Sequence, residues 1–118
     1  MALTSFDFQQ ARVKQVLFKS RLRSVLYGVR EAEPELFSMR DNPLGQWLQT
    51  SVKPALGTKP EVHEIDHVHQ QMLKTDQDLA RRYQSGLIEE ARSGLDQVNA
   101  YADQIDRLLT GLERSAAA

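Results

Sequence analysis

The sequence predicts an all-α fold, an antiparallel four-helix bundle of three long helices and one short helix. Apolar residues recur at intervals of three and four over three long stretches, which is the period of an amphipathic helix. No stretch alternates between apolar and polar residues over a useful length, so we expect no sheet. Short or pinned connections between the stretches favour an antiparallel arrangement.

The first expected helix begins at Thr4, whose hydroxyl can cap the helix, with Asp7 as an acidic residue in the first turn. It should end near residues 28–31. Its apolar stripe consists of Phe8, Ala11, Phe18, Leu22, Val25 and Val29. Gln15 occupies a position within this stripe, so we expect a polar amide on the inner face of the helix.

The second expected helix is short and covers residues 44–52, LGQWLQTSV, after a connector at residues 31–43. Apolar side chains gather on one side of it. Pro54 and Gly57 should end it, because neither residue favours a helix interior.

The third expected helix covers residues 59–84 and carries all three histidines of a chain without cysteine. Thr58 opens a capping-box pattern, with an acidic residue three positions later. The apolar stripe of this helix places His69 on the inner face. His63 and His67 are four residues apart on the solvent face.

The last expected helix covers residues 88–112 and has the most regular pattern in the chain: Ile88, Ala91, Leu95, Val98, Ala102, Ile105, Leu109 and Leu112. Gly94 is tolerated inside it at a cost of about 1 kcal/mol relative to alanine. Residues 115–118 should form a frayed tail. We therefore expect one domain over residues 1–118, with a core at about 6–112.

Composition narrows the possible functions. The chain has 118 residues, of which 41% are hydrophobic and 26% charged, and its net charge is −1. No apolar run approaches the roughly 20 residues that span a bilayer, and no secretory signal is recognisable. We expect a cytoplasmic protein without membrane insertion. The first helix is basic, but no aromatic residues interleave with its charges, so we expect it to pack against acidic helices and not to bind nucleic acid.

Three segments, VKQVLFKSRLRSVLYG, NPLGQW and PEVHEIDHVHQQM, resemble the chemoreceptor zinc-binding (CZB) domain family in order and spacing. The resemblance covers about residues 6–112. It implies a small helical bundle from the cytoplasmic parts of bacterial chemoreceptors and diguanylate cyclases, where zinc tunes chemotaxis and other signal transduction, commonly in a dimer. That family binds zinc in its core through three histidines and one cysteine. The corresponding positions here are Gln15, Asn42, His69 and Leu73.

Only one of these four positions keeps a zinc ligand, so we expect no metal in the core and no cofactor. Leu73 has no donor atom, and the amides of Gln15 and Asn42 are poor zinc ligands. We expect Gln15, Asn42 and His69 to form a metal-free hydrogen-bonded cluster beside Leu73. A histidine there could titrate near neutral pH.

The predicted function is a non-catalytic sensory, regulatory or protein-interaction domain. Its partner would be a second copy of the chain or a signalling protein. Val13 and Leu17 lie outside the apolar stripe of the first helix and indicate a homodimer through that helix.

One motif suggests an enzyme instead. His63 and His67, with Glu64 between them, match H-E-x-x-H, in which two histidines bind zinc and the glutamate acts as general base. Glu89 or Glu90 could supply a third ligand. The histidine pair lies on the solvent face, and no strand is expected to bind a substrate peptide. A zinc peptidase is therefore the least favoured reading.

A metal-binding sensor is the remaining alternative. It would bind zinc through His69 or through the surface pair His63 and His67. Metal analysis distinguishes this alternative from a metal-free domain.

Overall fold

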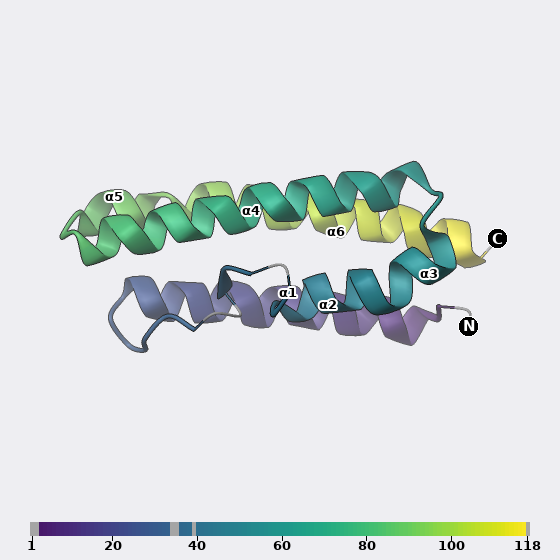
Figure 1. Ribbon diagram of the computed structural model, residues 1–118, viewed down its shortest axis with the longest axis horizontal. Coiled ribbons are helices and arrows are strands. Elements are labelled where there is room, and N and C mark those ends of the chain that lie inside the picture. The colour runs from purple at the N-terminus through teal and green to yellow at the C-terminus, as the bar shows by residue number, and fades with distance from the viewer. Residues whose placement is uncertain (1–2, 34–35, 39, 118) are drawn as a thin grey trace.

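The computed structural model describes residues 3–33, 36–38 and 40–117. Every regular element in these ranges is helical, as Figure 1 shows, and the all-α prediction is confirmed. The elements are α1 (Ser5–Leu26), α2 (Pro43–Trp47), a π-helical segment η2 (Leu48–Val52), α3 (Lys53–Leu56), α4 (Pro60–Gln84), α5 (Ile88–Ser93) and α6 (Leu95–Ala117). In the described part of the chain, no helix is both long and apolar enough to cross a membrane.

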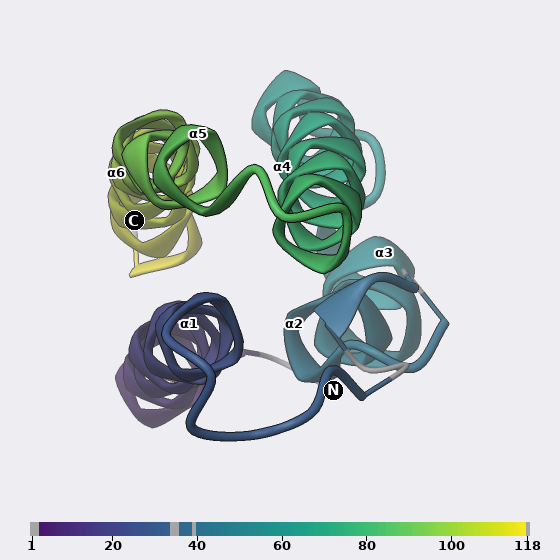
Figure 2. The same cartoon turned by 90° about the vertical axis from the view of Figure 1, so that its left-hand side faces the viewer.

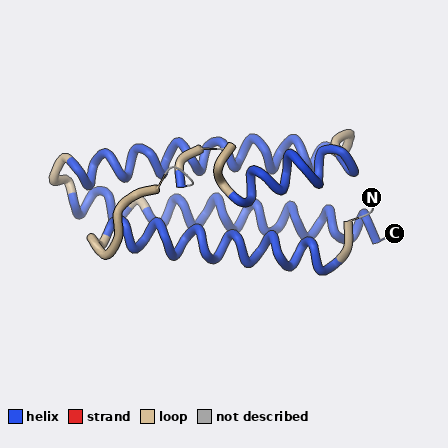
Figure 3. The backbone as a smooth tube through the Cα atoms, turned by 60° about the horizontal axis from the view of Figure 1, so that its bottom comes forward, coloured by secondary structure: helices blue, strands red, loops and turns tan. Residues whose placement is uncertain are grey.

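The helices pack together in an elongated body with principal extents of 49 × 20 × 19 Å. In Figure 2, α1, α4, α5 with α6, and α2 with α3 surround a common core, and α1 forms one corner. The loops lie at the helix ends and beside α2 (Figure 3). The core takes side chains from α1, α2, η2, α4, α5 and α6, and Leu22, Leu48, Ile65, Ile105 and Leu109 are all fully buried.

Helix α1 begins as the sequence predicts. The backbone N–H of Asp7 donates to Thr4 Oγ1 at 3.3 Å, and the N–H of Thr4 donates to Asp7 Oδ2 at 2.8 Å, which completes a capping box. The helix ends at Leu26, and Gly28 follows with φ 74°. Val29 was expected in the apolar stripe, but it is 78% exposed because the helix has already ended.

The short helix continues beyond its predicted end. Pro54 does not stop it, because the chain passes through η2 and continues as α3 to Leu56. The N–H of Lys53 bonds to the carbonyl of Leu48, five residues back, as in a π-helix. Pro54 then occupies the first turn of α3, a position where proline is tolerated.

Helix α4 begins with a different cap from the predicted one. Lys59 is the N-cap residue, and no side chain caps the helix end, so the capping box at Thr58 was wrong. Pro60 occupies the first turn, where its fixed φ is favourable. Thr58 therefore lies one residue before the N-cap position, too early to cap the helix. The helix ends at Gln84, and Gly86 has φ 88°, close to the predicted end.

The last predicted helix is interrupted at Gly94, which separates α5 from α6. A Cβ atom at this position would lie 2.2 Å from Leu79 Cδ2 of α4, so glycine permits the junction of α5 and α6 to pack closely against α4. At its other end α6 extends to Ala117. Residues 115–117 therefore belong to this helix, in line with the high helix propensity of alanine, and their fraying stays a prediction.

Candidate functional site

Four polar side chains lie in the interior among the described residues. Gln15 and Asn42 are each 1% exposed, and His69 and Asp76 are 0% exposed. They come from α1, from the N-cap of α2 and from α4. Three of them were predicted as site positions, and the fourth predicted position, Leu73, is also buried at 3%. Buried polar groups are normally hydrogen-bonded, so the partners of each one decide what the site can do.

Gln15 links α1 to α6. Its Nε2 donates to the backbone oxygen of Ala102 at 3.1 Å and to Asp106 Oδ1 at 3.4 Å. Its Oε1 is buried and accepts no hydrogen bond from any described residue. The amide therefore holds two helices together and leaves one acceptor unused.

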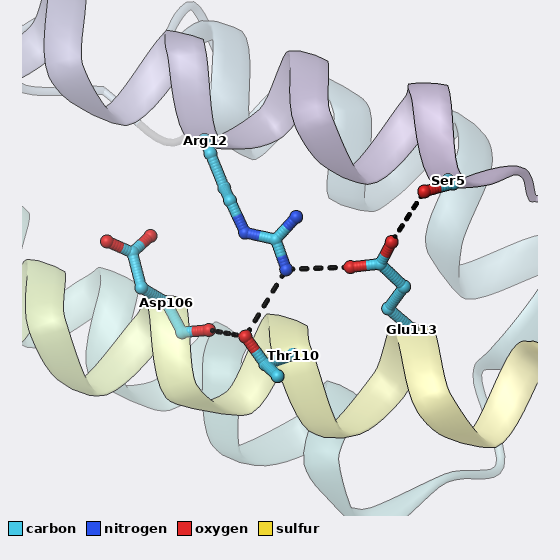
Figure 4. A network of polar contacts seen from close by, with 5 residues as sticks. All are labelled: Ser5, Arg12, Asp106, Thr110 and Glu113. Atoms are coloured by element: carbon cyan, nitrogen blue, oxygen red, sulfur yellow. Dashed lines mark hydrogen bonds and ion pairs between the residues drawn. The ribbon is translucent and has the colours of Figure 1, made fainter.

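A second group of polar contacts joins α1 to α6 closer to the ends of the chain, as Figure 4 shows. Arg12 Nη2 of α1 lies 2.8 Å from Glu113 Oε1 and 3.3 Å from Thr110 Oγ1 of α6. Ser5 Oγ donates to Glu113 Oε2 at 2.8 Å. The hydrogen bond from Arg12, followed by that from Ser5, lowers the pKa of Glu113. The basic first helix thus packs against an acidic partner, as the sequence predicts.

Asn42 has a local role in the backbone. Its Oδ1 accepts hydrogen bonds from the N–H groups of Leu44 at 3.0 Å and Gly45 at 3.3 Å, which caps α2. An asparagine here satisfies two backbone donors at the start of a helix. Its oxygen is therefore already occupied by the fold.

His69 is buried without a hydrogen-bond partner. Neither Nδ1 nor Nε2 bonds to any described residue, so the predicted cluster of Gln15, Asn42 and His69 was wrong. Burial lowers the pKa of His69 from 6.5 to about 4, and the nearby carboxylate of Asp66 opposes this shift only in part. The ring is neutral at pH 7. The expected titration near neutral pH was also wrong, because desolvation disfavours the charged imidazolium.

Asp76 belongs to the same interior, and it was not among the predicted site residues. It lies seven residues after His69 on α4, so the two side chains share one face of the helix. Both carboxyl oxygens are buried without a hydrogen-bond partner in the described chain. Burial raises the pKa of Asp76 to about 9, so the group is protonated and neutral at pH 7. The signal was present, because the apolar stripe of this helix is interrupted at positions 69 and 76.

The three histidines face as the sequence predicts: His69 is buried, and His63 and His67 are exposed on α4. Glu64 is exposed beside the pair. Among the described residues, no group of three or more histidine, cysteine, aspartate or glutamate side chains could hold a metal ion.

The expected third zinc ligand lies far from the histidine pair. Glu89 and Glu90 are on α5, which follows the far end of α4 (Figure 1). His63 lies in the first turn of α4, about 30 Å from that end at 1.5 Å per residue. The H-E-x-x-H sequence therefore places its two histidines on an open surface without either of these glutamates.

Comparison with known proteins identifies no relative of this chain, because no family model, curated protein or solved structure matches it. The resemblance to CZB domains thus rests on the sequence motifs alone. Chemically, the interior offers a neutral imidazole and a neutral carboxyl group. Both side chains are fully buried and have no direct access to a substrate in solvent.

Proposed function

We propose that this chain is a non-catalytic regulatory or protein-interaction domain related to CZB domains, whose core no longer binds zinc. We further propose an antiparallel four-helix bundle that acts in the cytoplasm on a second copy or a signalling protein. The absence of cysteine from the sequence and the resemblance support the cytoplasmic assignment.

One observation carries the proposal. The four positions that correspond to family zinc ligands are all interior, with exposed fractions of 1% for Gln15, 1% for Asn42, 0% for His69 and 3% for Leu73. Polar side chains are seldom this buried, and three separate elements supply them. A domain that kept these positions but exchanged three of the four ligands would keep the fold and lose the metal.

The surface of α1 supports a role in protein interaction. Val13, Val16 and Leu17 are 48%, 61% and 50% exposed, and exposed apolar clusters mark interaction sites. On its inner side α1 is joined to α6 through Gln15 and Arg12. A partner on the outer side of α1 would therefore bias the packing of α1 against α6.

Restoring the missing ligands tests the relationship directly. The triple variant Gln15→His, Asn42→Cys, Leu73→His should bind about one equivalent of zinc, and the wild type, purified without added metal, should contain none. Adding His69→Ala to the triple variant should abolish binding. Elemental analysis and calorimetric zinc titration are the measurements. Failure of the triple variant to bind zinc would reject the relationship, and stoichiometric zinc at His69 of the wild type would reject a metal-free core.

A crosslinking experiment tests the interaction role. A photo-crosslinking residue at Val16, on the exposed side of α1, should capture one specific partner in the cells that make this protein. The same residue at His63, exposed on α4, serves as the matched control. Equal capture at both positions, or none at Val16, would count against an interaction surface on α1.

The alternative metal sensor has one supporting observation, the exposed pair His63 and His67 one turn apart. Two histidines at this spacing can bind a surface ion. Zinc binding lost in His63→Ala and kept in His69→Ala would favour this alternative. Zinc-dependent hydrolysis of an unfolded protein, lost in Glu64→Gln, would restore the peptidase reading.

A further inference from the structure

Helix α1 has a second, outward-facing side that runs its whole length. Phe6, Val13, Ser20 and Tyr27 are spaced by seven residues, so they lie on one line along the helix. All four are exposed, and Phe6 reaches 68%. Val16 and Leu17 lie beside this line. We call these six residues the α1 outer face.

This face lies opposite the core-facing stripe of α1. In Figure 2, α1 is a corner of the structure, and its outer side faces none of the labelled helices. The helix has 22 residues and is therefore about 33 Å long at 1.5 Å per residue. That length accommodates about three heptads of a partner helix.

Unpaired positive charge flanks the α1 outer face. Lys14 lies on one side, and Lys19 and Arg23 lie on the other. None of these three side chains makes an ion pair or hydrogen bond with a described residue, although the Arg23 guanidinium lies 5.4 Å from the centre of the Tyr27 ring. Arg12, in contrast, is already paired with Glu113.

Two hollows lie beside the α1 outer face. Lys14 and Leu17 help to line one of about 100 Å³. Lys19, Arg23 and Tyr27 help to line a larger one of about 510 Å³ between α1 and the start of α6. Side chains of a docked helix could enter both hollows while its backbone follows α1.

We propose that the α1 outer face binds an amphipathic helix of a partner protein in which acidic residues flank the apolar stripe. This inference rests on the proposed interaction function and specifies its partner. The apolar residues would pack against Val13, Val16 and Leu17, and carboxylates on either side would pair with Lys14 and Lys19. Charge complementarity of this kind sets the orientation and choice of partner.

The same charges oppose a symmetric dimer through α1. A two-fold contact brings identical patches together, so the lysines of one copy would face those of the other. Like charges in such pairs are destabilising. A lipid surface is also less suitable than a protein, because Gln9, Gln10 and Ser20 interrupt the apolar residues and would lose hydrogen bonds in lipid.

The test uses the full chain and two designed helical peptides of about three heptads. Both peptides carry leucine at the core positions, and the flanking positions are all glutamate in one and all lysine in the other. Fluorescence anisotropy should show that the glutamate peptide binds at least about tenfold more tightly than the lysine peptide at about 0.15 M salt. Equal binding of the two peptides, or binding of neither, would overturn the proposal.

Substitutions locate the contact on the protein. Lys14→Glu with Lys19→Glu should reverse the peptide preference, and Leu17→Ser should weaken both complexes. These side chains are at the surface, so circular dichroism should show an unchanged fold. Lys74→Glu, on the exposed side of α4, is the matched charge control and should leave affinity unchanged. An equal effect of Lys74→Glu would show general charge attraction and reject the site.

Two further measurements separate this inference from the proposed function. If sedimentation shows a dimer that Leu17→Ser dissolves, a second copy occupies the face, so the inference fails while an interaction function remains. Tighter binding to phosphatidylserine vesicles than to the glutamate peptide, lost in the same lysine variants, would also overturn it. If no peptide binds and crosslinking at Val16 captures nothing, both the inference and the interaction function fail.

Discussion

Replacing Asp76 with asparagine should stabilise the folded protein, and the gain should increase as the pH rises. The carboxyl group is fully buried, and its oxygens accept no hydrogen bond from described residues. Burial raises its pKa from 3.8 to about 9, so folded Asp76 keeps a proton that the unfolded chain releases. Asparagine has nearly the same shape and does not ionise.

The size of the effect follows from proton linkage. Between the two pKa values the folded state binds one more proton than the unfolded state. The wild type therefore loses about 1.4 kcal/mol of stability for each unit of rising pH. From pH 4 to pH 7 the loss is about 4 kcal/mol, a large part of the roughly 5–15 kcal/mol that holds a typical domain together. The Asp76→Asn variant should not show this loss, and the two proteins should have similar stability near pH 4.

Urea unfolding at several pH values from 4 to 9, followed by circular dichroism, measures the difference in unfolding free energy. Because other ionisable groups are common to both proteins, the difference isolates Asp76. Asp78→Asn is the matched control on the same helix. The Asp78 side chain is 51% exposed and pairs with Arg82, so the change should stay within about 0.5 kcal/mol at every pH. A difference between Asp76→Asn and wild type that stays constant from pH 5 to pH 8 would refute the reasoning.

Three further predictions concern single positions. The stability of His69→Leu relative to wild type should increase by about 3 kcal/mol as the pH falls from 6.5 to 4, because burial lowers the pKa of His69 to about 4 in the folded state. Parallel pH profiles of the two proteins in urea unfolding would contradict this. Gly94→Ala should lower the unfolding free energy by about 1–3 kcal/mol, because the new methyl group would clash with Leu79. Gly111→Ala has open space around the new methyl group, so it should raise the unfolding free energy by about 0.5–1 kcal/mol. Equal melting temperatures of these two variants would argue against the clash. Thr4→Ala should cost about 1 kcal/mol by removing the capping box, and an unchanged thermal unfolding curve would exclude that role.

Features that depend on neighbours along the chain were predictable. The inward position of His69, the exposure of His63 and His67, and the cap at Thr4 all follow from helical period and local hydrogen bonding. Pro54 misled the prediction because it lies in the first turn of α3, where proline is tolerated. The sequence carries no clear signal for the π-helical segment that precedes it.

Within the long helices, the sequence by itself determined which residues face the interior, because the 3.6-residue period assigns the faces of a helix. Only the tertiary structure decided which groups those residues contact in the interior. Gln15 finds a carbonyl of α6, His69 finds no partner, and Asp76 holds its proton because distant helices exclude water from it. The close approach that favours glycine at position 94 comes from Leu79 of a separate helix. Desolvation and close packing are properties of the assembled helices, so no single segment encodes them.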